Sequence, residues 1–345
     1  MEKRVFSRGV VIAVLMGVAF SVTIQAWAAE QTAIDAAKKE GKFVWYTSLP
    51  TEPAVDYLKA FQAKYPFINT SEFFRSPALN VLSRLETEYK AGKAICDVFH
   101  IAAIPPYLKM VRDGWLMKFD SPVYQKYPEG SAVAGYWAAF RCMAAIGGYN
   151  KEVVQPGDVP KTWKDLSNPK WRGKIGAETG GASVQAQIYY TMDKMYGKSY
   201  WDQMKANKLK VQTGAGAMTV ALLRGEIEVA MCYYDYSVYE ESQLKKSPIR
   251  GIWFEEGVPR IVSPQAIMKN APHPNAAKLF QEWSLSEEGQ MKMVGIIGAY
   301  SARPDIAPPK GLPALTEFKS LFVQNMEEFA DFLSKFPDVW KGIVE

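Results

Sequence analysis

Two glycine-rich loops, 179–183 and 213–218, carry residues that could bind an anion. Each loop is expected to lead into a helix, the first over 184–197 and the second over 218–225. Free backbone N–H groups and the positive end of the helix dipole then point into one space, which attracts anions. The small residues could instead allow close helix packing, and neither loop has the spacing of a dinucleotide fingerprint or a Walker loop. The candidate ligand contacts here are Thr179, Gly180, Ser183, Thr213 and Gly214.

Two further side chains stand at the ends of expected strands. Arg75 follows a strand expected over 67–74 and opens a helix, so its guanidinium could clamp a carboxylate or a phosphonate through two hydrogen bonds. It could equally be a solvated residue at a helix start. His100 ends a strand expected over 94–101, at the edge where α/β clefts bind ligands. A single histidine there can also be a hydrogen-bonded wall residue.

Strands and helices alternate along the chain, which positions these residues. A short strand is expected over 42–48 and an amphipathic helix over 54–65, and the near-continuous apolar run 94–101 is typical of a parallel strand covered on both faces. A second unit with the same alternation follows the Gly- and Pro-bearing stretch 120–135. The pattern predicts an α/β fold with two domains.

The first 28 residues are typical of a secretory signal peptide. A basic start is followed by the apolar stretch 10–22 and by the small-x-small cleavage site Ala26-Trp27-Ala28. An uncleaved anchor is the alternative, although polar residues dilute the second half of the segment. We therefore expect an exported protein whose mature chain begins at Ala29.

The composition excludes several classes of protein. The 41 basic residues are spread along the chain against 36 acidic ones, so no nucleic-acid-binding surface is indicated. There are two histidines, far apart in sequence, and no Gly-x-Ser-x-Gly or His-Glu-x-x-His segment, so an enzyme is not expected. The cysteine count is odd and each cysteine lies in an apolar context, which predicts buried thiols. These cysteines are Cys96, Cys142 and Cys232.

Four segments resemble the extracellular solute-binding proteins of ABC importers, related to the ferric-iron, thiamine, polyamine and aminoethylphosphonate receptors. They are 159–175 (VPKTWKDLSNPKWRGKI), 222–227 (LLRGEI), 271–280 (APHPNAAKLF) and 285–290 (LSEEGQ). The resemblance implies a type II periplasmic-binding-protein fold, in which two α/β lobes joined by two crossover strands close on a ligand like a clamshell. It also implies a periplasmic monomer that delivers its ligand to a membrane permease and its ATPase.

The same resemblance implies how the chain divides. The expected parts are a signal peptide over 1–28, a first lobe over 29–132 plus about 252–310, a second lobe over 133–251, and C-terminal helices in 311–345 that pack on the lobes.

The resemblance also suggests the ligand. Ferric members of the family hold iron with adjacent tyrosines after a strand, and Tyr233 and Tyr234 occupy that context here, with Tyr236 close behind. Phenolates are hard oxygen donors, and binding to Fe(III) offsets the cost of deprotonating them. The metal ligands implied are Tyr233 and Tyr234, with His100 as a further candidate.

The first lobe departs from the ferric pattern. The loop after the first strand has Thr47 and Ser48, candidate ligand contacts, but no histidine, and the strand ending at His100 lacks the expected glutamate. A small organic anion, a carboxylate or a phosphonate, is the competing ligand, for which Arg75 would supply the charge and the tyrosines hydroxyl groups. We favour Fe(III) at this stage. An enzyme on the same fold or a sensor's partner protein are the alternatives from other classes.

Overall fold

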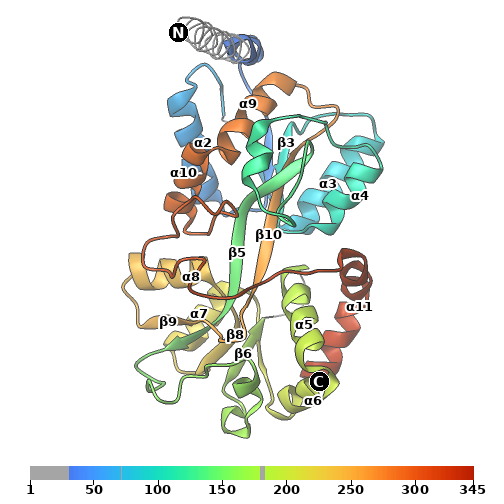
Figure 1. Cartoon of the computed structure of the whole chain (residues 1–345). Coiled ribbons are helices and arrows are strands. Elements are labelled where there is room, and N and C mark those ends of the chain that lie inside the picture. Colours follow the sequence, from blue (N-terminus) through green and yellow to red (C-terminus); the bar gives the residue numbers. More distant parts are fainter. Residues whose placement is uncertain (1–30, 71, 179–182) are drawn as a thin grey trace, which may run out of the picture.

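Two long strands run through both halves of the molecule, as the computed structural model of the chain shows (Figure 1). The structure describes residues 31–70, 72–178 and 183–345. Strand β5 (Trp137–Asn150) and strand β10 (Val258–Ile267) pair in antiparallel fashion, with a bulge between Ser263 and Pro264. Nearly all their residues are buried, as expected of strands covered on both faces. They are the two crossover strands of a two-lobed α/β fold.

The first lobe is built on the sheet order β2-β1-β3-β10-β5. Strands β1 (Trp45–Thr47), β2 (Phe73–Arg75) and β3 (Val98–His100) are parallel, and β4 (Ala132–Val133) pairs with β5. A helix over 31–40 precedes β1. The other helices of this lobe are α2 (Thr51–Lys64), α3 (Ala78–Lys90), α4 (Pro105–Arg112), α9 (Pro274–Leu285) and α10 (Glu287–Ile297).

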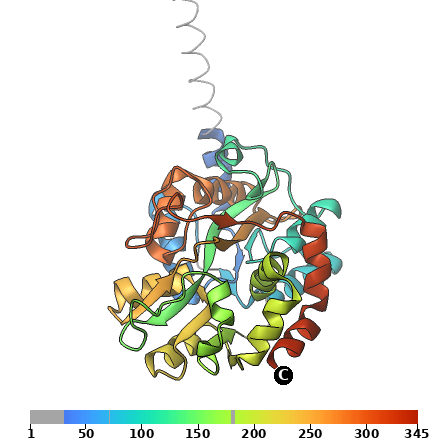
Figure 2. The same cartoon turned by 60° about the horizontal axis from the view of Figure 1, so that its bottom comes forward.

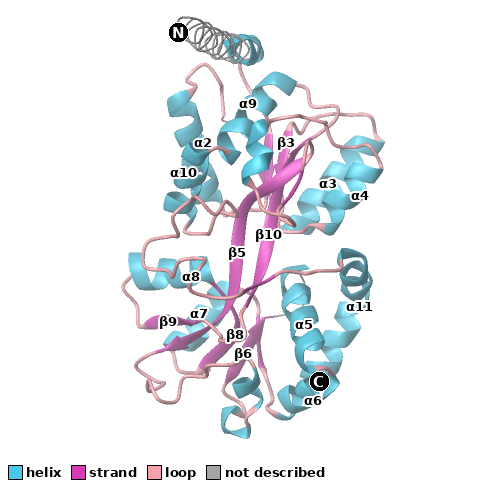
Figure 3. Cartoon of the chain, in the orientation of Figure 1, coloured by secondary structure: helices cyan, strands magenta, loops and turns pink. Residues whose placement is uncertain are grey.

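The second lobe continues the same sheet in the order β5-β8-β6-β7. Its strands are β6 (Ile175–Glu178), β7 (Lys210–Gln212), β8 (Val229–Tyr234) and β9 (Ile249–Ile252), and the short β11 (Ser320–Leu321) pairs with β10. Its helices are α5 (Ser183–Tyr196), α6 (Lys198–Ala206), α7 (Ala215–Leu223) and α8 (Asp235–Tyr239). Helices cover both sides of the strands in each lobe (Figure 3).

The C-terminal helix α11 (Met326–Val344) lies along the second lobe. It packs against α5 and α6 and runs down one side of that lobe (Figure 2). Its buried face, which includes Phe329, Phe336 and Trp340, joins the same hydrophobic core as the side chains of α5.

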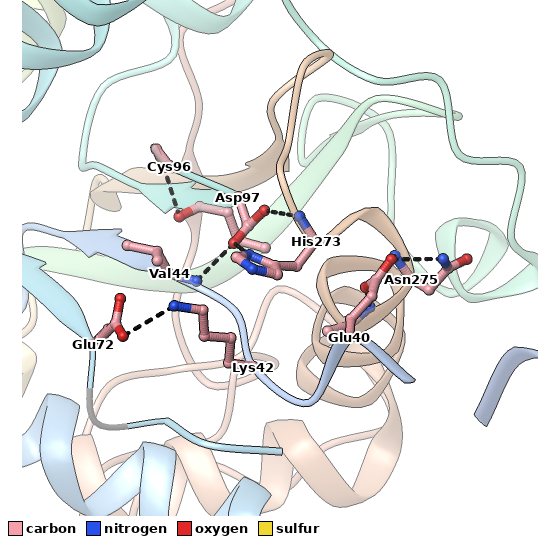
Figure 4. Close-up of polar contacts among 10 residues, drawn as sticks. Glu40, Lys42, Val44, Glu72, Cys96, Asp97, His273 and Asn275 are labelled. Carbon is pink, nitrogen blue, oxygen red and sulfur yellow. Dashed lines mark hydrogen bonds and ion pairs between the residues drawn. The ribbon is translucent and has the colours of Figure 1, made fainter. Parts of the chain in front are cut away.

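Two carboxylates, the buried Asp97 and the half-buried Glu40, anchor the late segment of the chain on the first lobe (Figure 4). Asp97 accepts hydrogen bonds from the Val44 backbone N–H at 2.8 Å and from the His273 backbone N–H at 2.6 Å, and lies 2.9 Å from His273 Nδ1. Glu40 accepts from the backbone N–H groups of Asn275 and Ala276 at the start of α9. A carboxylate at a helix N-terminus satisfies N–H groups that have no partner inside the helix.

We propose that the two lobes have the limits expected from the sequence, because α9 and α10 pack against α2 of the first lobe, whereas α11 packs against α5 of the second.

One local expectation was wrong, since the strand expected over 67–74 begins only at Phe73. In the second lobe, the Asp165 carboxylate accepts the backbone N–H groups of Lys161 and Thr162 and closes a tight turn ahead of a short 3₁₀ helix over Lys164–Ser167. The prediction of buried thiols is confirmed, since all three cysteines are free and buried.

The signal peptide expected over 1–28 lies outside the described residues. Within 31–70, 72–178 and 183–345, no helix has the length and apolar character needed to cross a membrane.

Candidate ligand-binding cleft

A cavity of about 770 Å³ lies between the lobes, beside the crossover strand β5. The first lobe lines it with Ser48 after β1, with α3 and with the 101–115 segment around α4. Arg141 and Met143 of β5 form its inner wall, and the second lobe adds residues from β6, α5, β8 and α8. Helix α11 completes the wall with Ala330 and Leu333.

Three polar side chains of the second lobe are bonded to one another in this cavity. Tyr234 donates its hydroxyl to Glu178 Oε2 at 2.7 Å and accepts a hydrogen bond from Gln185 Nε2 at 2.7 Å. Burial raises the pKa of Glu178, against the hydrogen bonds from Tyr234 and Gln185 that lower it. Burial also raises the pKa of Tyr234 well above 10, so its phenol is neutral. Tyr236 stacks on Tyr234 with the ring centres 5.4 Å apart.

Arg141 brings a buried positive charge to the cavity. Arg141 is only 6% exposed, and the central carbon of its guanidinium group lies 5.8 Å from the centre of the Tyr236 ring. No carboxylate among the described residues forms an ion pair with it, and its Nε has no hydrogen-bond partner there. A buried cation without a counterion is costly, so a bound anion would stabilise it.

Asp235 acts on Arg141 at longer range. Burial raises the pKa of Asp235 to about 7, while the charges of Arg260 and Arg141 lower it. Asp235 is therefore only a partial counterion at neutral pH. Arg260 of β10 does not line the cavity, and its guanidinium carbon lies 5.1 Å from the centre of the Tyr300 ring.

Two more polar atoms at the cavity are buried without partners among the described residues: Ser48 Oγ and Gln185 Oε1. Buried polar atoms are hydrogen-bonded in most folded proteins, so these atoms are candidate ligand contacts. Together with Arg141 they offer one cation, one hydroxyl and one amide oxygen.

Of the residues predicted from the sequence, Ser48, Tyr234 and Tyr236 line the cavity. Thr47 and His100 do not: Thr47 Oγ1 lies 3.0 Å from His100 Nδ1, and both residues are fully buried. The His100 ring packs beside Trp45 and Phe140. Burial lowers the pKa of His100 well below 6.5, with Arg141 adding to the effect, so the imidazole is neutral.

Tyr233 faces the opposite side of β8 from Tyr234. Its hydroxyl lies 2.6 Å from Thr219 Oγ1 of α7, and its ring joins the core between β8 and that helix. Successive residues of a strand point to opposite faces, so two adjacent tyrosines inside β8 cannot both reach the cavity. The pair of aromatic rings at the cavity is Tyr234 with Tyr236.

The remaining predicted residues lie around the cavity edge or outside the described part. Arg75 is exposed and donates from Nε to the Leu49 carbonyl oxygen, and it does not line the cavity. Thr213 and Gly214 precede α7, and a Cβ placed on Gly214 would lie 3.7 Å from Glu178 Oε1, so this helix start approaches the polar cluster. Thr179 and Gly180 lie outside the described residues, and Ser183 is the first residue of α5.

Sequence reasoning missed Arg141, Glu178 and Gln185. A signal for Arg141 was available, because it is the one charged residue in the otherwise apolar run 137–150. Glu178 follows an apolar strand directly, which is the position where α/β proteins place ligand contacts. Gln185 has no comparable signal, since a polar residue in the first turn of a helix is ordinary.

The donor set can be compared with what a metal ion needs. No group of three or more His, Cys, Asp or Glu side chains among the described residues could hold a metal ion. The hard oxygen donors of the second lobe at the cavity are Glu178, Tyr234 and Tyr236, and Glu86 of the first lobe is paired with Lys90. The nearby charge of Arg141 opposes a bound cation.

A mixed sheet through two α/β lobes, two crossover strands and a polar cavity between the lobes define the class of two-lobed periplasmic binding proteins. The chain belongs to the family of bacterial extracellular solute-binding proteins, whose model matches residues 97–325.

Named relatives differ in what they bind. The chain is 26% identical over 287 residues to an uncharacterised protein of Haemophilus influenzae, covering 79% of this chain and 81% of the relative. It is 24% identical to the Fe(3+)-binding periplasmic protein of Serratia marcescens, covering 55% and 60%. It is 22% identical to a putative 2-aminoethylphosphonate-binding periplasmic protein of Salmonella typhimurium, covering 57% and 62%. The chain thus spans less than two thirds of the last two relatives.

Solved structures share the fold. Iron-bound HitA from Pseudomonas aeruginosa superposes with a TM-score of 0.75 at 22% identity, covering 88% of this chain and 99% of HitA. The matched family is one of solute-binding proteins, in keeping with the sequence prediction of a receptor.

Proposed function

We propose that this protein is the periplasmic receptor of an ABC importer and that it binds a small organic anion, a carboxylate or a phosphonate, between its lobes. The observation that carries the proposal is Arg141, a buried cation at the cavity with no ion-pair partner in the described chain. Closure of the lobes would remove the anion from water and strengthen its attraction to the guanidinium.

The neighbouring groups support an anionic ligand with further polar atoms. Ser48 from the first lobe and Gln185 from the second face one cavity, so a single ligand could contact both lobes at once. Such two-sided contact is what links ligand binding to hinge closure. A relative named for 2-aminoethylphosphonate binding is consistent with this chemistry.

Fe(III) is the second candidate. It is favoured by the grouping of Glu178, Tyr234 and Tyr236, all oxygen donors, and by relatives named for ferric iron. It is weakened because Tyr233 and His100 lie away from the cavity and because Arg141 lies within it. These features move our preference from iron, favoured on the sequence, to the anion.

The test compares two arginines by thermal melting and calorimetry with a panel of carboxylates, phosphonates and ferric citrate. We expect at least one organic anion to raise the melting temperature, Arg141→Gln to weaken its binding at least about tenfold, and Arg75→Gln to leave it unchanged. Equal binding by wild type and Arg141→Gln would contradict the proposal. A visible iron–tyrosinate band with ferric citrate, with no response to any anion, would assign the cavity to iron.

A further inference from the structure

Helix α3 carries apolar side chains beyond those that its own lobe buries. Val81 and Leu85 are buried and form its core face. Ala78, Leu79 and Leu82 line the cavity on the adjoining side of the helix. Ala78 and Leu82 also pack against the core of the lobe, whereas Leu79 is 65% exposed. The apolar stripe of α3 is therefore wider than its own lobe covers, and its uncovered edge faces the cavity.

Helix α11 repeats this arrangement on the other lobe. Its core face is buried against α5 and α6. Ala330 is exposed and Leu333 is half-buried against that core, and both line the same cavity. Figure 1 shows α3 and α4 of the first lobe on the same side of β5 and β10 as α5 and α11 of the second lobe. The cavity therefore has apolar walls contributed by both lobes.

The buried polar groups come from strands of the sheet: Arg141 from β5, Glu178 from β6 and Tyr234 from β8. Charged residues of the first lobe also line the cavity. Glu86 pairs with Lys90 and Lys109 with Asp113 along their own helices, and Arg112 at the end of α4 is exposed to solvent. The cavity thus combines a polar inner wall with apolar helix faces.

The volume of the cavity indicates the size of the ligand that it can enclose. A volume of about 770 Å³ lies in the range of roughly 300–1,000 Å³ that encloses organic ligands. Inorganic phosphate or a bare metal ion would leave Leu79 and the exposed parts of Leu82 and Leu333 uncovered. An apolar group on the ligand would cover them, with a gain of roughly 25 cal/mol for each Å² removed from water.

We infer that the ligand is an amphipathic anion, whose acidic group binds at Arg141 and whose apolar group lies between α3 and α11. The inference rests on the proposed function and narrows its substrate class. Closure then buries the apolar group between Leu79 and Leu82 of one lobe and Leu333 of the other, so these side chains select for the ligand's hydrocarbon part.

The test uses two probes with the same acidic group, methylphosphonate and phenylphosphonate, measured by calorimetry on the full chain. We expect phenylphosphonate to bind at least about tenfold more tightly. Leu79→Asn and Leu333→Asn should each reduce that preference severalfold and leave methylphosphonate binding unchanged. Leu244→Asn is the matched control, because Leu244 is 63% exposed and does not line the cavity.

The outcomes separate the two proposals. Equal affinity for both probes, with Arg141→Gln weakening both, would overturn the amphipathic ligand and leave the anion receptor standing. A preference that Leu79→Asn and Leu333→Asn both leave intact would also overturn it. Binding of neither probe, nor of benzoate and acetate as the carboxylate pair, would overturn the anion receptor and this inference together. Melting of each variant without ligand shows that it is folded.

Discussion

Tyr234 donates its hydroxyl to Glu178 at 2.7 Å, across two parallel neighbouring strands. Tyr234 ends β8 and Glu178 ends β6, so the carboxyl ends of both strands meet at the cavity. This edge of an α/β sheet is where ligands bind in many such folds. The bond couples a half-buried carboxylate to a buried phenol inside the proposed binding site.

The two adjacent tyrosines should behave differently. Tyr234→Phe leaves Glu178 and Gln185 without their shared partner, so we expect binding of phenylphosphonate, or of iron if iron is the ligand, to weaken at least about tenfold. Tyr233→Phe removes only the contact with Thr219, which should cost about 1 kcal/mol of folding free energy and leave affinity unchanged. Calorimetry and urea unfolding of both variants measure this, and an affinity loss confined to Tyr233→Phe would contradict the geometry.

His100 should make the folded state sensitive to acid. Burial lowers its pKa well below 6.5 in the folded protein, so the unfolded chain binds more protons as the pH falls through 6.5. The free energy of unfolding should therefore decrease as the pH falls below 6.5. Above pH 6.5 the titration of His100 should not change it. His100→Gln should flatten the decrease when urea unfolding is measured from pH 8 to pH 4.5. Parallel curves for the two proteins would show that His100 does not contribute.

Asp97 should contribute far more stability than a surface acid of the same lobe. Asp97→Ala leaves the backbone N–H groups of Val44 and His273 without their acceptor, at an expected cost of about 3 kcal/mol. Glu72, whose side chain is 55% exposed in an ion pair with Lys42, is the control, and Glu72→Ala should change stability by less than about 0.5 kcal/mol. Urea unfolding at neutral pH compares them, and similar losses for both would refute the anchoring role (Figure 4).

Two glycines of α10 should respond in opposite directions to a methyl group. A Cβ on Gly289 would lie 1.9 Å from the Trp283 carbonyl oxygen, so Gly289→Ala should destabilise the protein by about 3 kcal/mol. Gly295 lies in the same helix with nothing within 4 Å of such an atom, so Gly295→Ala should stabilise it by roughly 0.5 kcal/mol. Thermal melting of the two variants measures the difference, and a loss of stability from Gly295→Ala would count against the helix geometry.

The sequence by itself determined the elements and the class of fold. The apolar run 94–101 contains β3, the helix expected over 218–225 overlaps α7, and the helix expected over 184–197 nearly coincides with α5. These elements are predictable because burial and local backbone preferences depend on neighbouring residues. The four segments that resemble solute-binding proteins indicated the two-lobed architecture. The apolar surroundings of the cysteines likewise predicted their burial.

Only the tertiary structure decided which polar groups face the ligand. Strand alternation turns one of two adjacent tyrosines outward from the cavity, and which one depends on where the helices of the second lobe pack. Arg141 and Tyr236 are 95 positions apart, and their contact exists because β5 crosses between the lobes next to β8. Local sequence patterns do not encode such distant pairs, so the chemistry of the cleft emerged from packing, whereas the helices and strands were set by the sequence.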